Sequence, residues 1–395
     1  MTSELFTIRR RVCYHFTGFE PLSANVHRLR YVRSARKSAE TYGFNLKFGA
    51  ADDDAPVPNF NVVASADGWQ TETRVFLADH KSVIDLLDSH SFATRLSGAL
   101  RAAFDCIWQG ALYRFVKTAP RFALLSVFPY LFLIFSVLAI AAIAAWPLIG
   151  GLSWQHFAWS IPASFAFYRF VLLPISAKLH VKLLLDANRF VNLATNPELP
   201  EIRAEVARHV TGLETALKEE ADEFLITTHS MGCVFGIFAV AALLERNPGC
   251  FAGRNAAFMT IAGNGMFVSL HGSARELRHS IRKILECPDI QWLDVQCRSD
   301  PVQLHGGHVV RGHIPLDPSF AGVREPHVRS AKPNRMVTKQ QYKSMKWDLL
   351  HKHRQFVLGS HLPSDFDFFI LTAGPHRAFY MRNLRPRQKL SVVMS

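Results

Sequence analysis

Charged residues occur throughout both ends of the chain but are missing from one long stretch near its middle. Between Arg121 and Arg169 there is no Asp, Glu, Lys or Arg. A bilayer core of roughly 30 Å needs about 20 helical residues, so this stretch is long enough for two crossings. The pattern predicts a helix over Phe122–Trp146, a turn over Pro147–Ser153 and a returning helix over Trp154–Leu173.

The returning helix is the weaker of the two predicted spans. Pro162 and Pro174 would kink it and Arg169 would shorten it, so a re-entrant or interfacial helix is an alternative. A buried helical hairpin in a soluble core is another, although such helices rarely run this long without a charge.

The turn of the uncharged stretch contains no Lys or Arg. Basic residues flank the stretch on both sides: Arg114, Lys117, Arg121, Lys178 and Lys182. By the positive-inside rule, both ends of the hairpin, and hence both termini, are expected in the cytoplasm. The chain begins without an apolar stretch before Arg9, so we expect no cleavable signal peptide and expect the hairpin itself to direct insertion.

Outside the hairpin, short apolar runs alternate with amphipathic patterns, which predicts an α/β fold: a mostly parallel sheet with helices on both faces. Expected strands are 11–17, 44–48, 59–64, 73–78, 223–228, 256–262, 291–297 and 366–371. Expected helices are 23–42, 202–219, 231–245, 274–286 and a short one near His376. We expect one α/β domain made of residues 1–115 and 183–395, interrupted by the hairpin insertion at 116–182. Residues 303–365 are polar and contain prolines, which predicts a further insertion that could act as a lid.

The chain is basic, with a formal net charge of +13. A hydrophobic hairpin makes a bilayer with anionic headgroups the simpler partner, and no clustered motif indicates nucleic acid. The basic C-terminal tail fits contact with an anionic leaflet, with a merely solvated tail as the equal alternative: Arg377, Arg382, Arg385, Arg387 and Lys389. The six cysteines show no C-x-x-C spacing, so neither a disulfide framework nor a zinc ribbon is indicated.

A candidate nucleophile stands between a predicted strand and a predicted helix. The strand 223–228 runs into Thr-His-Ser-Met-Gly at 228–232, and an apolar helix follows. This is the context of a nucleophile elbow, where the strained turn exposes a serine and requires small neighbours such as Gly232. Thr228 replaces the usual first glycine and crowds the turn. A turn serine without chemistry is the alternative for Ser230.

A serine nucleophile needs a histidine base and a carboxylate that orients it. Asp300 follows the strand 291–297 at its carboxyl end, whereas its competitor Asp294 lies inside that strand. His376 follows the last predicted strand, which makes it the expected base, with a surface or capping histidine as the alternative. The backbone N–H groups of Met231, which begins the helix, and of Phe19, after Gly18, are the expected oxyanion donors.

These motifs, Thr-His-Ser-Met-Gly at 228–232, Asp-Pro-Val at 300–302 and Gly-Pro-His at 374–376, resemble the α/β-hydrolase superfamily, and more narrowly bacterial membrane proteins of that class. The resemblance covers roughly residues 10–80 and 200–384. It implies a Ser230–Asp300–His376 triad, ester or thioester chemistry, no cofactor and attachment to a bacterial inner membrane. The chain departs from the family at Thr228 and in the long interval between Asp300 and His376.

The function expected from this pattern is an esterase, lipase or thioesterase that cleaves acyl esters, with a lipid-like substrate fitting the membrane context. An acyltransferase with the same triad would differ only in its acceptor. A catalytically inactive hydrolase fold that serves as a membrane scaffold or partner-binding module is the rival from another class. The insertion also carries several histidines, which we interpret as surface residues and not as metal ligands because no H-E-x-x-H spacing occurs: His305, His308, His313, His351 and His353.

Overall fold

One sheet of eight strands forms the centre of the molecule. The structure is a computed structural model that describes residues 8–196, 199–345 and 348–379. The strand order is β2-β3-β4-β1-β5-β6-β7-β8. β4, β1 and β5 to β8 run parallel to one another, whereas β2, β3 and β4 pair antiparallel. The strands are β1 (Arg10–Phe16), β2 (Asn45–Asp52), β3 (Asn59–Ala66), β4 (Trp69–Ala78), β5 (Glu223–His229), β6 (Ala256–Ile261), β7 (Ile290–Gln296) and β8 (His327–Ser330).

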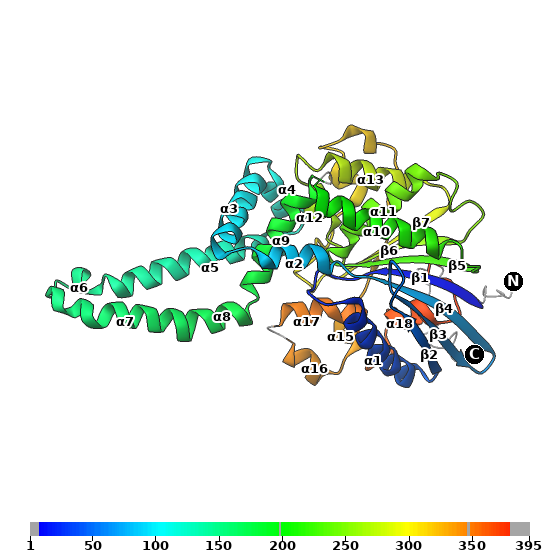
Figure 1. Ribbon diagram of the computed structural model, residues 1–395, viewed down its shortest axis with the longest axis horizontal. Helices are drawn as coiled ribbons and strands as arrows, with labels where there is room; N and C mark the ends of the chain where they lie inside the picture. The colour runs from blue at the N-terminus through cyan, green and yellow to red at the C-terminus, as the bar shows by residue number, and fades with distance from the viewer. Residues whose placement is uncertain (1–7, 197–198, 346–347, 380–395) are drawn as a thin grey trace.

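Helices cover both faces of this sheet (Figure 1), so the predicted α/β class with a mostly parallel sheet is confirmed. On one face, α10 (Pro200–Ala216), α11 (Gly232–Arg246) and α13 (Arg275–Glu286) pack side by side. On the other face lie α1 (Ala24–Tyr42) and α18 (Phe368–Ala373). Short helices complete the second half: α12 (Gly265–Ser269), α14 (Val309–His313), η3 (Pro318–Phe320), α15 (Pro333–Met336), α16 (Lys339–Ser344), α17 (Leu349–Arg354) and η4 (Gln355–Val357).

The central strands are buried on both sides, as strands between two helical layers must be. In β1, the side chains of Val12, Tyr14 and Phe16 belong to the core beneath α10 and α11. Cys13, which alternates with them, belongs to the core beneath α1 and α18. Because successive side chains of a strand point to opposite faces, one seven-residue strand contributes to two cores.

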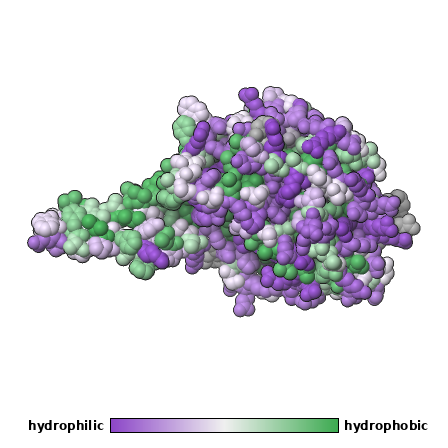
Figure 2. Space-filling view, in the orientation of Figure 1, coloured by the Kyte–Doolittle hydropathy of each residue, from purple (hydrophilic) through white to green (hydrophobic). Residues whose placement is uncertain are grey.

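A helical hairpin projects away from this body (Figure 1), where the uncharged stretch predicted it. Its first leg is α5 (Pro120–Ala144), and its second leg, Trp154–Lys178, comprises η1 (Trp154–His156), α7 (Phe157–Phe167), η2 (Tyr168–Leu172) and α8 (Leu173–Lys178), with α6 (Trp146–Ile149) at the turn. Both legs are 25 residues long and apolar enough to cross a membrane. Only 11% and 17% of the residues in their apolar windows are buried, so the alternative of a hairpin buried in a soluble core is wrong. Figure 2 shows the hairpin's apolar surface as the green region of the projection.

Four helices near the base of the hairpin were not predicted. α2 (Lys81–Ser89), α3 (Phe92–Trp108) and α4 (Ala111–Thr118) lie between β4 and the hairpin, and α9 (Val181–Ala194) follows it. α9 packs against both α3 and α5. The hairpin is therefore joined to the sheet through a helical layer, and not directly.

The predicted final strand 366–371 is wrong, because Phe368–Ala373 is helix α18. The carboxylate of Asp367 accepts the N–H groups of Phe369 and Ile370, which satisfies the first turn of a helix. All six residues of α18 are buried, so its apolar run lacks a polar side that would distinguish a helix from a buried strand. The strand that does join the sheet after β7 is β8, a largely exposed edge strand without apolar alternation. The described residues after α18, including His376, form no helix.

Candidate functional site

Ser230 occupies a sharp turn between β5 and α11, the position that the sequence predicted. Its φ of 54° lies in the left-handed region, which is uncommon for a residue with a side chain. The turn is fixed by its backbone, because the Ser230 N–H donates to the Ile261 carbonyl at 3.2 Å and the Ser230 carbonyl accepts the Asn264 N–H at 3.1 Å. A strained backbone held in this way is typical of a functional turn.

The residue two positions after Ser230 has to be glycine. A Cβ placed on Gly232 would lie 2.0 Å from the Thr17 carbonyl oxygen, because the loop after β1 passes directly over the start of α11. Thr228 replaces the glycine expected at this position, and its side chain is accommodated by a glycine one turn further along the helix. A Cβ on Gly236 would lie 2.6 Å from the Thr228 Cγ2, so the absence of that Cβ leaves room for the threonine methyl group.

Asp300 lies beyond the end of β7 and faces His353 of α17. The Asp300 Oδ2 lies 2.6 Å from the His353 Nδ1, and both side chains are buried. The carboxylate is also held by the Val302 N–H, which donates to Oδ1 at 2.9 Å, and by the Gln303 amide, which donates to Oδ2 at 3.3 Å. Because a carboxylate is an acceptor, His353 carries its proton on Nδ1 in this pair.

The other ring nitrogen of His353, Nε2, is buried and has no hydrogen-bond partner among the described residues. His353 and Ser230 line the same pocket. With Nδ1 bonded to Asp300, Nε2 is the basic nitrogen of the ring. The structure thus brings together a turn serine, a histidine with a free basic nitrogen and a carboxylate that orients it.

His376 is not part of this group, and its prediction as the base is wrong. Its carbonyl oxygen accepts the Arg11 guanidinium at 2.6 Å, and Arg11 lies at the start of β1 and binds Glu223 at the start of β5. Ser230 follows the opposite end of β5, about 20 Å away at 3.3 Å per residue. The error follows from the wrong final strand, since a helix at 368–373 returns the chain to the amino ends of the strands.

The interpretation of the insertion's histidines as surface residues is wrong for His353 and His313. Both side chains are buried. One sequence signal favours His353. It follows Asp300 by 53 residues, which is a shorter interval than the one between Asp300 and His376 that departs from the family pattern. The insertion predicted as a lid therefore supplies a site residue. The predicted contact of the C-terminal tail with lipid falls outside the described residues except for Arg377.

The two predicted oxyanion donors lie at the pocket. Phe19 and Met231 both line it, together with Gly18. Met231 is the N-cap of α11, and the first N–H groups of a helix have no acceptor within the helix. A Cβ on Gly18 would lie 2.8 Å from the His229 Nδ1, so glycine lets the loop after β1 approach the elbow closely. Burial holds the pKa of His229 well below its usual value, and His229 is therefore a neutral wall of the site.

The pocket lies where the hairpin meets the α/β body. It measures about 740 Å³, open space included. One side is formed by the serine turn and His353, and the other by apolar residues at the start of α5 and in α9: Phe122, Leu125, Leu183, Leu184 and Ala187. An apolar pocket with a few convergent polar groups is the usual form of a small-molecule site.

Comparison of the chain with protein-family models, curated proteins and solved structures gave no match. The fold and the geometry of this pocket are therefore the observations from which a function is inferred.

Proposed function

We propose that the protein is a membrane-anchored serine hydrolase of the α/β-hydrolase type that cleaves acyl esters through an acyl-enzyme intermediate. The observation that carries the proposal is the Asp300–His353 pair in the pocket where Ser230 occupies a left-handed turn. The pair supplies a base of fixed tautomer, and the turn presents the nucleophile at the start of a helix. The triad is Ser230, His353 and Asp300.

In the first half of the reaction, the Ser230 Oγ attacks the acyl carbonyl carbon and the His353 Nε2 takes the hydroxyl proton. Asp300 remains ionised and stabilises the imidazolium through Nδ1. The oxyanion is held by the N–H groups of Met231 and Phe19. When the intermediate collapses, the ester bond breaks, His353 returns the proton to the leaving alkoxide, and the acyl group stays on Ser230.

In the second half, water attacks the acyl-enzyme and His353 takes its proton. Collapse of this intermediate releases the carboxylic acid and returns the proton to the Ser230 Oγ, which regenerates the enzyme. No cofactor is required by these steps, since the protein groups provide nucleophile, base and oxyanion donors.

The membrane part of the proposal rests on the exposure of apolar side chains. Ile134, Phe135 and Leu138 of α5 are more than half exposed, as expected of side chains that face lipid tails. Two further exposed apolar residues, Ile107 and Trp108, end α3, the helix that packs against α9. We infer that the α/β body lies against the cytoplasmic face of a bacterial inner membrane, with its basic flanks toward anionic headgroups.

The position of the pocket favours an amphiphilic ester as substrate. Its apolar wall is built from the start of α5, the first leg of the hairpin, and from α9, which follows the second leg. A substrate in the cytoplasmic leaflet would therefore need to leave the bilayer only by a short distance, and its acyl chain would remain among apolar side chains.

Labelling with a fluorophosphonate probe tests the chemistry directly, because the probe reacts with an activated serine. We expect labelling of the full chain in detergent, none for Ser230→Ala, and a loss of more than about 100-fold in labelling rate for His353→Gln. His376→Gln is the matched control, since it changes another buried histidine at the far end of the sheet and should label at the wild-type rate.

The outcomes separate this proposal from its rival. A folded wild-type chain that does not label, over a range of pH, would favour the inactive scaffold. Labelling that is lost in His376→Gln but kept in His353→Gln would overturn the assignment of the base. Acyl transfer to an added alcohol, measured against release of free acid, decides between transferase and hydrolase for an active chain.

A further inference from the structure

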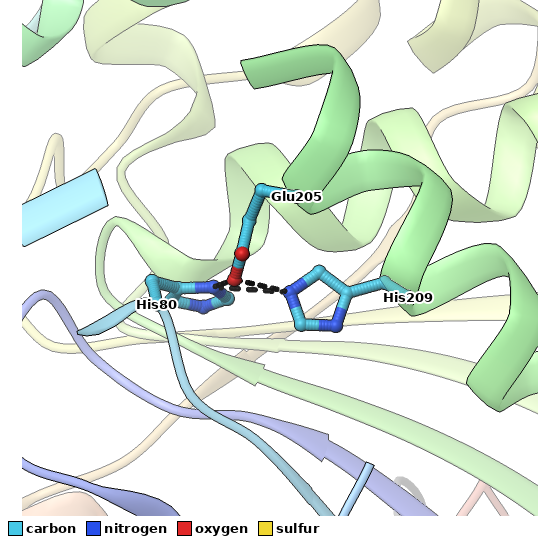
Figure 3. A group of neighbouring side chains, drawn as sticks. All are labelled: His80, Glu205 and His209. Atoms are coloured by element: carbon cyan, nitrogen blue, oxygen red, sulfur yellow. Dashed lines mark hydrogen bonds and ion pairs between the residues drawn. The ribbon is translucent and has the colours of Figure 1, made fainter. Parts of the chain in front are cut away.

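Three buried side chains that bear metal-ligand atoms meet on the α10 side of the sheet, as Figure 3 shows. His80 lies two residues after the end of β4 and is the N-cap of α2. Glu205 and His209 lie one turn apart on α10, so both reach toward the same point. The sequence signal is a Glu-x-x-x-His pair in a predicted helix, which indicates nothing until the fold adds His80. None of the three is among the described residues that line the Ser230 pocket.

The three inner atoms lie close enough to one another to bind one metal ion. The His209 Nε2 lies 3.1 Å from the Glu205 Oε1 and 3.2 Å from the His80 Nδ1, and the His80 Nδ1 lies 3.6 Å from the same carboxylate oxygen. The first two separations lie within the usual hydrogen-bond range of about 2.7–3.2 Å, whereas the third lies outside it. Two ligands of a tetrahedral zinc ion, each about 2.0–2.1 Å from the metal, lie about 3.3–3.4 Å apart.

A single ion placed between the three atoms would lie at bonding distance from each of them. A point equidistant from three atoms with these separations lies about 1.9 Å from each, so an ion slightly above their plane would have zinc-like bond lengths. Two imidazoles and one carboxylate are a donor set that zinc accepts, with a fourth position left for water.

The outer contacts hold Glu205 in place. Its Oε2 accepts the Ser82 hydroxyl at 2.7 Å, and its Oε1 accepts Arg208 at 2.6 Å. The Arg208 guanidinium neutralises part of the ligand charge.

We propose that His80, Glu205 and His209 form a buried site for a divalent transition-metal ion, with Zn²⁺ as the ion whose geometry fits. The site is structural. It would tie α10 to the end of β4 and, through the His80 ring stacked on Phe235 at 4.3 Å, to the helix that begins at the serine turn. This inference is independent of the hydrolase proposal, since an inactive chain could bind the same ion.

The experiment uses the full chain in detergent, stripped with a chelator and titrated with Zn²⁺ or Co²⁺ alone. We expect one zinc per chain by elemental analysis, the visible absorption of tetrahedral Co²⁺ on cobalt binding, and a higher thermal midpoint with either ion. His80→Gln and His209→Gln should weaken Zn²⁺ affinity by more than about 100-fold. His271→Gln is the control, because His271 is also buried and neither of its ring nitrogens has a hydrogen-bond partner among the described residues.

The wild-type titration remains decisive if the variants do not fold. A stripped, folded wild-type chain that takes up no stoichiometric Zn²⁺ and gives no tetrahedral Co²⁺ spectrum would overturn the proposal. So would folded His80→Gln and His209→Gln chains that bind Zn²⁺ as tightly as the His271→Gln control. Fluorophosphonate labelling of the same samples shows separately whether the serine site is active.

Discussion

Replacing Asp300 by asparagine tests the proposed triad at its most specific contact. The substitution keeps the size of the side chain but leaves only one acceptor oxygen. In the structure, the Asp300 Oδ1 accepts the Val302 N–H, while Oδ2 faces both the His353 Nδ1 and the Gln303 amide. If the asparagine oxygen stays on Val302, its NH₂ group faces His353, which can then only accept at Nδ1.

The consequence is a change of tautomer in His353. Its proton moves to Nε2, so this nitrogen can no longer act as the base proposed for Ser230. Loss of the correct tautomer costs about 10⁴-fold in kcat for a serine triad, or roughly 5 kcal/mol in the activation barrier. The unfolding free energy should fall by only about 1–3 kcal/mol, which is the value of a hydrogen bond to a charged group.

The assay is hydrolysis of a chromogenic acyl ester, together with the rate of fluorophosphonate labelling and a denaturant titration. Asp294→Asn is the control, because Asp294 is another buried carboxylate of the same strand region and bonds Thr260 and Gln296 instead of a histidine. We expect it to keep kcat within about threefold. The reasoning is refuted if folded Asp300→Asn keeps more than about a tenth of the wild-type kcat, or if both variants lose activity equally.

Three further predictions concern the turn, the buried histidines and the pocket. Gly236→Ala should lower the unfolding free energy by about 1–3 kcal/mol, because the new methyl group would contact the Thr228 methyl group. In the double mutant, Thr228→Ala should relieve about 1 kcal/mol of that cost. Additive effects of the two substitutions on the unfolding free energy, measured by denaturant titration, would contradict this coupling. Burial lowers the pKa of His313 to about 4 from its usual 6.5, so below pH 6.5 the unfolded chain binds a proton that the folded chain does not, and stability falls toward pH 4 by up to about 1.4 kcal/mol per pH unit. His313→Gln should flatten the pH dependence of the unfolding free energy over this window, and an unchanged slope would speak against it. Leu184→Trp fills the apolar wall of the pocket and should shift the preferred acyl chain of a p-nitrophenyl ester series to shorter lengths, whereas an unchanged length profile would place the acyl chain elsewhere.

Features that depend on neighbouring residues in the chain could be predicted from the amino-acid pattern. The serine turn could be predicted because a strand, a small residue at Gly232 and an apolar helix are consecutive and dictate one local geometry. The hairpin could be predicted because the absence of charge over a stretch of known length is a property of composition. The mostly parallel sheet followed from the alternation of apolar strands and amphipathic helices, since parallel strands need a crossover between them.

Contacts between residues that are distant in the chain became known only from the folded arrangement. Asp300 is placed by the strand before it, but the histidine that joins it depends on the path of the 303–365 insertion, whose polar pattern fixes no register. The apolar run at 366–371 is compatible with either a buried helix or a buried strand. Interpreting it as a strand predicted His376 as the base instead of His353. The group of His80, Glu205 and His209 arises in the same way. His80 precedes the hairpin in the chain and α10 follows it, so only the packing of α10 beside the end of β4 brings the three residues together. Contacts between residues far apart in the chain depend on packing of the whole domain, and a local pattern carries no information about them.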